Sequence, residues 1–135
     1  MYELNVAAAV EKLNDVIAFL EEIMEKHDVP MKVCLQMQVA VEEIFVNIAH
    51  YSYPSGAGPV RIEADIPEGG GSITIRFIDQ GVPYDPLQKK DPDITLSADD
   101  RPIGGLGIFM VKKSMNDVTY EYKDNSNILT IRKCF

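Results

Sequence analysis

The feature that most constrains the fold is a long helical segment, residues 31–51, that is apolar on almost every side. It begins after Pro30 and ends at the turn-forming segment 53–56. A helix with apolar side chains nearly all round must be covered by other elements of the chain. A chain of 135 residues is long enough to provide that cover within one domain, residues 1–135.

A second helix is predicted before this one. Asn5 is placed to cap a helix that ends before Asp28, because apolar residues between these points recur at three- and four-residue spacing. These residues are Val6, Ala9, Val10, Leu13, Val16, Ile17, Leu20, Ile23 and Met24. We therefore expect one side of this helix to be apolar.

Two pairs of segments alternate apolar with polar residues, which is typical of strands with one wet face. Segments 60–66 and 73–79 are joined by a glycine-rich turn. Segments 117–123 and 128–133 are separated by the turn residues 124–127. Each pair predicts a β-hairpin.

The segment between the hairpins, about residues 80–103, is rich in Pro, Asp and Gly and is longer than most connections, so we expect a functional lid. A short helix over about 106–114 follows it. The predicted order is two helices, a hairpin, the lid, a helix and a hairpin. Hairpins require an antiparallel or mixed sheet. The fold class expected is α+β, a two-layer α/β sandwich with a mixed, mostly antiparallel sheet and helices on one face.

Charge and composition exclude several classes of protein. A net charge of −8 argues against nucleic acid as a partner, because such binding depends on Lys and Arg at phosphates. No basic leader precedes an apolar stretch, and no apolar run reaches the length of about 18 residues of a membrane span, so we expect a cytoplasmic protein with no membrane partner. Cys34 and Cys134 lack metal-binding spacing and are expected to be reduced thiols.

A polar stripe runs along the helix over residues 31–51. A helical wheel groups Gln36, Glu43, Asn47 and His50 on one side, opposite Met37, Val41, Ile44 and Ile48. The stripe is either the solvent face of the helix or the lining of a cavity. In a cavity, a carboxylate one turn from an amide would suit activation of a hydroxyl beside a hydrated Mg²⁺.

A second motif is Asp79-x-Gly81, directly after a strand. It is either an ordinary turn, where Asp and Gly are favoured, or part of a binding site. In a site, Asp79 would be a buried acceptor for an exocyclic amine such as that of adenine. Gly81 would let a planar ring approach the backbone.

A third motif is 104-GGLG-107, directly before the predicted helix. The pattern GxxxxGK[ST] is absent, which excludes a P-loop, and no apolar strand precedes the glycines as a Rossmann motif requires. The glycines are either a hinge or a way to aim free amides at an anion.

Together, Glu43-x-x-x-Asn47, Asp79-x-Gly81, the lid and Gly104-Gly105-Leu106-Gly107 resemble the N, G1 and G2 boxes of the Bergerat-fold ATPase superfamily. That superfamily includes Hsp90, gyrase B, histidine kinases and MutL. The resemblance implies a histidine kinase/Hsp90-like ATPase fold with ATP and Mg²⁺ as cofactors.

Within that superfamily the chain looks most like the stand-alone anti-sigma factor serine/threonine kinases. The resemblance rests on the segments 42–54, 79–86 and 101–122. It implies that Glu43 is the general base, that Asn47 holds Mg²⁺ and that Asp79 binds the adenine amine. It also implies room for nucleotide and phosphates at the remaining site residues, Gly81, Gly104, Gly105, Leu106 and Gly107.

Two further residues depend on the same comparison. Arg101 is the cation closest before the glycines and is a candidate to reach the terminal phosphate. Many such kinases carry a histidine where this chain has Tyr51, so His50 is expected to be structural or exposed.

The function expected is an ATP·Mg²⁺-dependent serine/threonine protein kinase that phosphorylates an anti-anti-sigma (STAS-like) antagonist. Sequestering a sigma factor, and pairing as a homodimer through the first helix, follow from the resemblance alone. The alternative is a nucleotide-gated binding module without kinase activity. A histidine-kinase catalytic domain is less favoured, because His27 at the end of the first helix is in the wrong setting for a phosphoacceptor.

Overall fold

The computed structural model describes residues 1–88 and 105–135, apart from the side chains of residues 88, 105 and 106. Five strands and three α-helices make up this part of the chain. They are β1 (Tyr2–Ala7), α1 (Leu13–Lys26), α2 (Met31–Tyr51), β2 (Pro59–Asp65), β3 (Ser72–Asp79), α3 (Gly105–Ser114), β4 (Asp117–Lys123) and β5 (Ser126–Cys134). Short 3-10 turns precede α1 (Val10–Lys12) and follow β3 (Pro86–Gln88).

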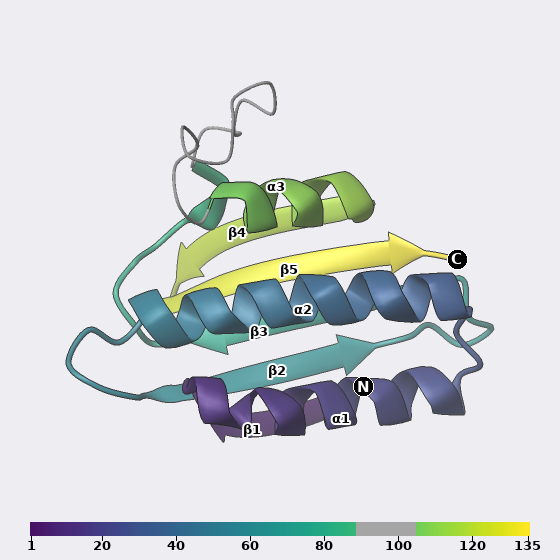
Figure 1. The fold of residues 1–135 in the computed structure, drawn as a ribbon, viewed down its shortest axis with the longest axis horizontal. Helices are drawn as coiled ribbons and strands as arrows, with labels where there is room; N and C mark the ends of the chain where they lie inside the picture. Colours follow the sequence, from purple (N-terminus) through teal and green to yellow (C-terminus); the bar gives the residue numbers. More distant parts are fainter. Residues whose placement is uncertain (89–104) are drawn as a thin grey trace.

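The strands form one sheet in the order β1-β2-β3-β5-β4, and the three helices lie across one face of it (Figure 1). This arrangement confirms the two-layer α+β fold. All four strand pairings are antiparallel, so the sheet in the described residues is not mixed. The central position of β3 places the end of that strand beside the start of β5.

The start of the chain differs from the helix predicted to begin at Asn5. Residues Tyr2–Ala7 form strand β1, which pairs with β2 and places Asn5 opposite Arg61. The alternation of Tyr2, Leu4 and Val6 on the half-buried side suits a strand, and pairing with β2 outweighs the helical spacing. The later part of the predicted helix is confirmed, since α1 runs from Leu13 to Lys26 and ends just before Asp28.

The other predicted elements are confirmed to within a few residues. Helix α2 has the predicted bounds, and the two hairpins are β2–β3 and β4–β5. The turn of the second hairpin is shorter than expected. Only Asp124 and Asn125 turn the chain, both with positive φ (54° and 60°), as a two-residue hairpin turn requires. Strand β5 therefore begins at Ser126, so Asn127 lies in the sheet.

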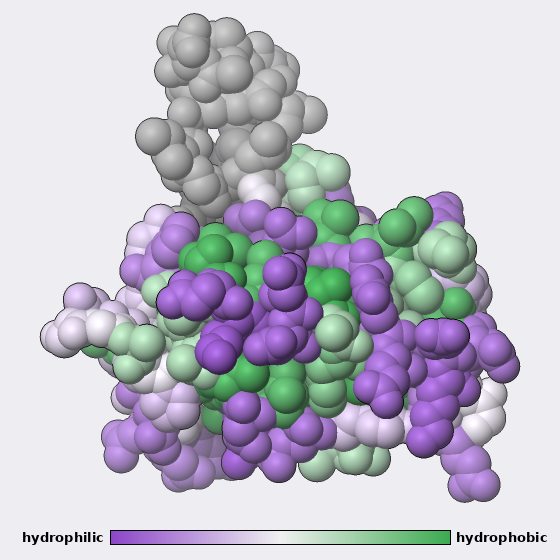
Figure 2. Space-filling view, turned by 60° about the horizontal axis from the view of Figure 1, so that its bottom comes forward, coloured by the Kyte–Doolittle hydropathy of each residue, from purple (hydrophilic) through white to green (hydrophobic). Residues whose placement is uncertain are grey.

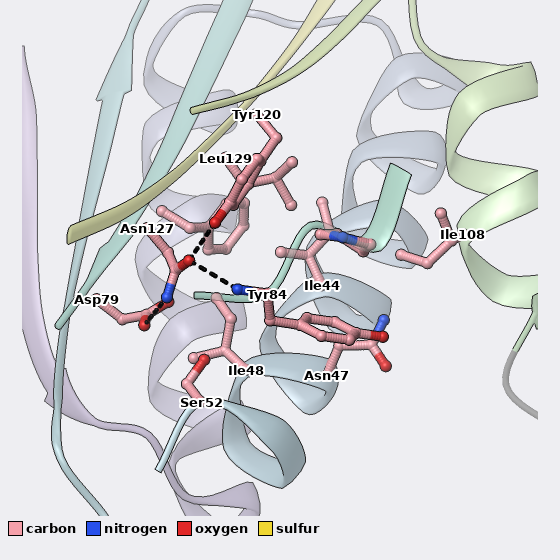
Figure 3. A pocket seen from close by; sticks show the side chains of 12 residues that line it. Ile44, Asn47, Ile48, Ser52, Asp79, Tyr84, Ile108, Tyr120, Asn127 and Leu129 are labelled. Carbon is pink, nitrogen blue, oxygen red and sulfur yellow. Dashed lines mark hydrogen bonds between the residues drawn. The ribbon is translucent and has the colours of Figure 1, made fainter. Parts of the chain in front are cut away.

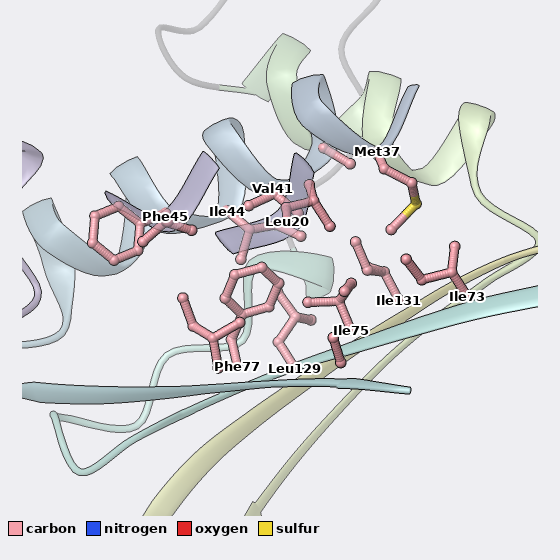
Figure 4. Packing of buried hydrophobic residues seen from close by; sticks show 14 of the residues in the cluster. Leu20, Met37, Val41, Ile44, Phe45, Ile73, Ile75, Phe77, Leu129 and Ile131 are labelled. Atoms are coloured by element: carbon pink, nitrogen blue, oxygen red, sulfur yellow. The ribbon is translucent and has the colours of Figure 1, made fainter. Parts of the chain in front are cut away.

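The hydrophobic core lies between α2 and the central strands. Figure 4 shows side chains of α2 pointing toward those of β3 and β5. Those drawn from α2 are Met37, Val41, Ile44 and Phe45, and those from the strands are Ile73, Ile75, Phe77, Leu129 and Ile131. The long apolar helix is thus covered by the sheet on one side and by α1 and α3 on its flanks, but the cover is less complete than its composition predicts, because Met31, Leu35 and Val39 remain exposed.

Ile75 offers a test of this core. Its side chain is 1% exposed, and Ile75→Ala should lower the free energy of unfolding by about 3 kcal/mol, through lost burial and the cavity left behind. Ile78 is the matched control, because it lies on the other face of β3 and is only half-buried. Urea unfolding of both variants measures the difference. Equal losses would contradict the assignment of the two faces.

Other expectations concern the chain as a whole. Cys34 and Cys134 are free thiols. Within the described residues, none of the helices is both long and apolar enough to cross a bilayer. Of the predicted lid, residues 89–103 lie outside the described part of the chain.

Candidate functional site

Polar and apolar side chains meet at one end of the sandwich, where β3 ends, β5 begins and the last turns of α2 approach α3 (Figure 3). They enclose a small pocket. Its lining residues are Ile44, Asn47, Ile48, Ser52, Phe77, Asp79, Tyr84, Pro86, Ile108, Tyr120, Asn127 and Leu129. Two predicted binding residues, Asn47 and Asp79, therefore share one pocket although they come from different elements.

Asp79 is the carboxylate of this pocket and is 3% exposed. Its Oδ1 accepts hydrogen bonds from Asn127 Nδ2 and from the backbone N–H of Gly81, both at 2.9 Å. Among the described residues, no hydrogen bond reaches Oδ2. One oxygen thus fixes the carboxylate, and the other remains an acceptor for a donor in the pocket.

Asn127 holds Asp79 in place and is itself 4% exposed. Its Nδ2 also donates to Val82 O at 2.9 Å. Its Oδ1 accepts from the backbone N–H of Tyr84 at 3.1 Å and from the hydroxyl of Tyr120. All the donors and acceptors of this buried amide are used, so it fixes Asp79 and the segment after β3 in one arrangement.

Sequence reasoning missed Asn127, because it treated residues 124–127 as a turn. The side chain reaches Asp79 only because β5 pairs with β3, where Asn127 stands opposite Asp79 in the register. Helix α3 and strand β4 separate these two strands in the chain, so no local sequence pattern predicts their pairing. The signal that could have helped is a polar residue just before the alternating segment 128–133.

The rest of the pocket is largely apolar and narrow. Ile44 and Ile48 of α2 form one wall, and Phe77 and Leu129 of the sheet form another. Tyr84, from the segment after β3, completes the outer wall and stacks on Tyr51, with ring centroids 5.4 Å apart and planes 27° from parallel. The cavity volume is about 20 Å³. A mainly apolar lining with the free Asp79 oxygen among it is the composition expected of a site for an apolar ring that carries an amine, although a ring would need a wider pocket.

Asn47 and Glu43 lie one turn apart on α2, on the side that faces α3. Asn47 Nδ2 is buried and finds no hydrogen-bond partner among the described residues. A buried amide without a partner is costly, which points to a ligand at this place. Rotation of the amide would present Oδ1 there, and a neutral oxygen suits Mg²⁺.

The donor set fits a Mg²⁺ that is bound mainly by phosphates and water. No cluster of three or more His, Cys, Asp or Glu side chains able to hold a metal occurs in the described ranges 1–88 and 105–135. Magnesium at nucleotide sites commonly takes only one or two protein ligands. The role of Asn47 as such a ligand stays a prediction.

Gly107 lies against Glu43. A Cβ added at Gly107 would overlap the Glu43 carboxyl group, so no other residue fits there while Glu43 keeps its position. The glycine therefore allows the first turn of α3 to approach the carboxylate. Room for phosphates at Gly107 stays a prediction, and the contact with Glu43 is a second reason for a glycine.

Gly81 has a similar structural reason. A Cβ there would overlap the backbone carbonyl of Ser52, the residue that ends α2. The same carbonyl accepts a hydrogen bond from Val82 N at 2.8 Å. Asp79-x-Gly81 thus joins the end of β3 to the end of α2, and room for a nucleotide ring at Gly81 stays a prediction.

Tyr53 also stabilises the connection between the end of β3 and the end of α2. Its hydroxyl donates to Pro59 O at 2.6 Å and accepts from Gln80 N at 2.8 Å. Burial raises the pKa of Tyr53, the hydrogen bond from Gln80 lowers it, and the negative charge of Asp79 adds to the rise.

Tyr53→Phe should therefore lower the free energy of unfolding by about 1–2 kcal/mol at neutral pH, because both hydrogen bonds are lost. A raised pKa means that the native state holds the phenolic proton more tightly than the unfolded chain does. This stabilisation is present below about pH 10 and is lost as the pH rises through the folded pKa. Urea unfolding at neutral and alkaline pH should show a weaker alkaline loss in the variant. An identical loss in both proteins would exclude Tyr53 as the group.

The remaining predicted residues are placed less directly. Gly105 and Leu106 belong to the first turn of α3, and the side chain of Leu106 is not described. Arg101 and Gly104 lie outside the described residues. His50 is exposed and does not line the pocket, as expected.

Comparisons with known proteins found protein kinases of similar sequence and one matching family model. The serine/threonine-protein kinase BtrW of Bordetella bronchiseptica is 26% identical over 129 residues, which cover 96% of this chain and 89% of that protein. The serine-protein kinases RsbW of Bacillus thuringiensis and Bacillus cereus are each 26% identical over 97 residues, covering 69% of this chain and 59% of those proteins. A family model described as the histidine kinase-like ATPase domain matches residues 6–133. Because that match spans nearly the whole chain, the protein belongs to the histidine kinase-like ATPase domain family, as the three sequence motifs predicted.

Proposed function

We propose that the protein is an ATP·Mg²⁺-dependent serine/threonine kinase that acts on a protein antagonist of the anti-anti-sigma (STAS-like) class. An ATPase domain implies an ATP site. The observation that carries the proposal is that Asp79 and Asn47 line one pocket, while Glu43, one turn from Asn47 on α2, lies against Gly107 of α3. The similarity to BtrW and RsbW, both named as protein kinases, supports the choice of phosphotransfer over hydrolysis.

Asp79 and the apolar walls of the pocket would hold the base. Oδ2 of Asp79 would accept a hydrogen bond from the exocyclic amine of adenine, while Oδ1 stays bound to Asn127 and Gly81. The flat walls formed by Ile44 and Phe77 would exclude water from both faces of the ring. The triphosphate would then extend toward Asn47 and the first turn of α3.

Glu43 is the proposed general base. Its carboxylate would accept the proton of the attacking serine or threonine hydroxyl, whose oxygen forms the new bond to phosphorus while the bond to the leaving diphosphate breaks. Asn47, one turn further on, would hold Mg²⁺. The metal would neutralise charge on the phosphates. The first turn of α3 would direct backbone N–H groups at the same charge.

The direct test is transfer of phosphate to a partner. Purified protein, Mg²⁺ and labelled ATP should convert a serine or threonine of a STAS-like antagonist from the same cell to its phosphorylated form, as read by mass spectrometry. Chelation of Mg²⁺ should stop the transfer. If ATP binds and the antagonist associates but no phosphorylated residue forms, the protein is a nucleotide-gated binding module instead.

Three further parts of the proposal come from the sequence analysis and not from the pocket. They are a cytoplasmic location, sequestration of a sigma factor and formation of a homodimer. Helix α1 buries Val16, Leu20, Ile23 and Met24 in the core of its own chain, so a dimer through this helix would use its half-buried and polar residues. Analytical ultracentrifugation at rising concentration tests the homodimer.

A further inference from the structure

Helix α2 exposes a line of apolar side chains far from the pocket. Met31, Leu35 and Val39 are 72%, 56% and 62% exposed. They are spaced four residues apart, so they form one stripe that rises about 12 Å along the helix. We call these three residues the α2 stripe. It lies on the N-terminal half of α2, and Leu35 is about 18 Å along the helix from Asn47.

Single exposed apolar residues are normal, but this arrangement differs from scattered ones. Val10, Val82 and Tyr122 are also exposed, but they lie far apart in the chain, before α1, after β3 and on β4. Only on α2, within the described residues, do three such side chains follow one another on successive turns. Figure 2, seen from the side on which α1 and β1 lie, shows apolar surface running between polar groups.

An acidic groove borders the α2 stripe. It runs between α1 and α2, has a volume of about 380 Å³ and includes Met31 in its wall. Glu21, Glu25 and Asp28 line it and are all exposed. No ion pair to these three carboxylates occurs in the described part of the chain, and Glu21 only accepts a hydrogen bond from Gln38 Nε2 at 3.0 Å.

The outer face of the sheet provides a contrast. There Arg61 lies 3.4 Å from Glu3 and 3.3 Å from Glu63, and Arg76 lies 2.9 Å from Glu63, so these four side chains offset one another's charge. The groove beside the α2 stripe combines unpaired negative charge with exposed apolar surface.

We propose that the α2 stripe and the acidic groove together bind a cationic amphipathic helix of a partner protein. The apolar side of that helix would pack on the stripe, and its Lys or Arg side chains would reach the carboxylates of the groove. A methionine and a leucine in the stripe suit this use, because flexible side chains adapt to the contours of a helix. The site is separate from the nucleotide pocket and does not depend on kinase activity.

The negative charge of the groove decides between possible occupants. An anionic membrane surface would be repelled by the same carboxylates. A second copy of this chain would bring a second set of these carboxylates to the contact, and like charges oppose such pairing. A cationic helix satisfies both the charge and the apolar surface.

The test uses a defined probe. A peptide of about 18 residues built from Leu, Ala and Lys as an amphipathic helix, about five turns long, is titrated into the full chain. A scrambled peptide of the same composition carries the same charge without an apolar side. The amphipathic peptide should bind at least tenfold more tightly than the scrambled one. Equal binding of the two would show charge attraction alone and overturn the proposal.

Two variants and two matched controls locate the site. Met31→Gln/Leu35→Gln/Val39→Gln removes the stripe, and Glu21→Lys/Glu25→Lys reverses the groove charge. Each should weaken peptide binding at least tenfold. The controls, Val10→Gln/Tyr122→Gln and Glu68→Lys/Glu121→Lys, change exposed residues elsewhere and should leave binding within about twofold. Equal weakening by a variant and its control would overturn the proposal.

Cys34 gives a readout inside the groove. Its thiol lines the groove and donates to Val29 O at 3.4 Å, whereas Cys134 is exposed at the end of β5. Bound peptide should slow alkylation of Cys34 and leave the rate at Cys134 unchanged. Slowing at neither or at both cysteines would contradict the placement. A concentration-dependent dimer that the stripe variant dissociates would identify a second copy as the occupant and also overturn the proposal.

Discussion

Glu43→Gln should lower the rate of phosphate transfer about a thousandfold and leave the affinity for ATP nearly unchanged. Glutamine keeps the size of the side chain beside Gly107, so the contact between α2 and α3 is preserved. What it loses is the ability to accept a proton from the attacking hydroxyl, and such catalysis typically contributes between about 10² and 10⁴ in rate. Single-turnover transfer at saturating ATP measures the chemical step, and calorimetric titration measures the affinity.

Glu42 is the matched control for this variant. It is the neighbouring residue on α2 and has the same charge, but its side chain is exposed. Glu42→Gln should transfer phosphate at a rate within about twofold of the unaltered protein. If both variants keep full activity, Glu43 is not the base. If Glu43→Gln loses ATP binding as well, its role is in the nucleotide site rather than in proton transfer.

Asp79→Asn should weaken ATP binding at least a hundredfold with little effect on the fold. An asparagine can keep Oδ1 as the acceptor for Asn127 Nδ2 and Gly81 N. Its other atom becomes an N–H₂ donor in place of Oδ2, and that donor would face the amine of adenine. Two donors that meet in a buried pocket leave both unpaired, which is among the costliest errors in recognition.

The preference for one nucleotide base over another distinguishes lost recognition of adenine from a general loss of folding in the Asp79→Asn variant. Inosine triphosphate carries an oxygen where ATP carries the amine, so the unaltered protein should prefer ATP. The Asp79→Asn variant should lose or invert that preference. Thermal melting without nucleotide is the control for folding, with Asp65→Asn as an exposed comparison at the end of β2. An unchanged ratio of the two affinities would mean that Asp79 does not read the base.

Much of the fold was predictable because the elements carry strong local periodicity. Helix α2 was placed at its observed bounds, since an apolar segment between Pro30 and a turn has few other solutions. The hairpins followed from alternation on both sides of turn residues. The motifs around Asn47 and Asp79 also indicated one site, although only the fold shows that both line the same pocket.

The failures arise where long-range pairing decides the structure. The helix is predicted to begin after Asn5, whereas α1 begins at Leu13, because Val6 belongs both to the helical spacing that follows it and to the alternation of Tyr2 and Leu4, and the pairing with β2 selects the strand. Asn127 was mistaken for part of a turn for a related reason. The close approaches at Gly81 and Gly107 are equally invisible in the sequence, since each depends on an atom from α2.

The small size of the pocket also affects how fast a nucleotide can bind. A cavity of about 20 Å³ holds about one water molecule, and a purine is several times larger. Tyr84, Pro86 and Ile108 must therefore move outward before a base can enter. Binding then has two steps, and the observed association rate should rise with ATP concentration and level off at the rate of opening. In that regime we expect the stacking of Tyr84 on Tyr51 to influence the speed of capture, and the proposed role of Asp79 would concern selectivity instead.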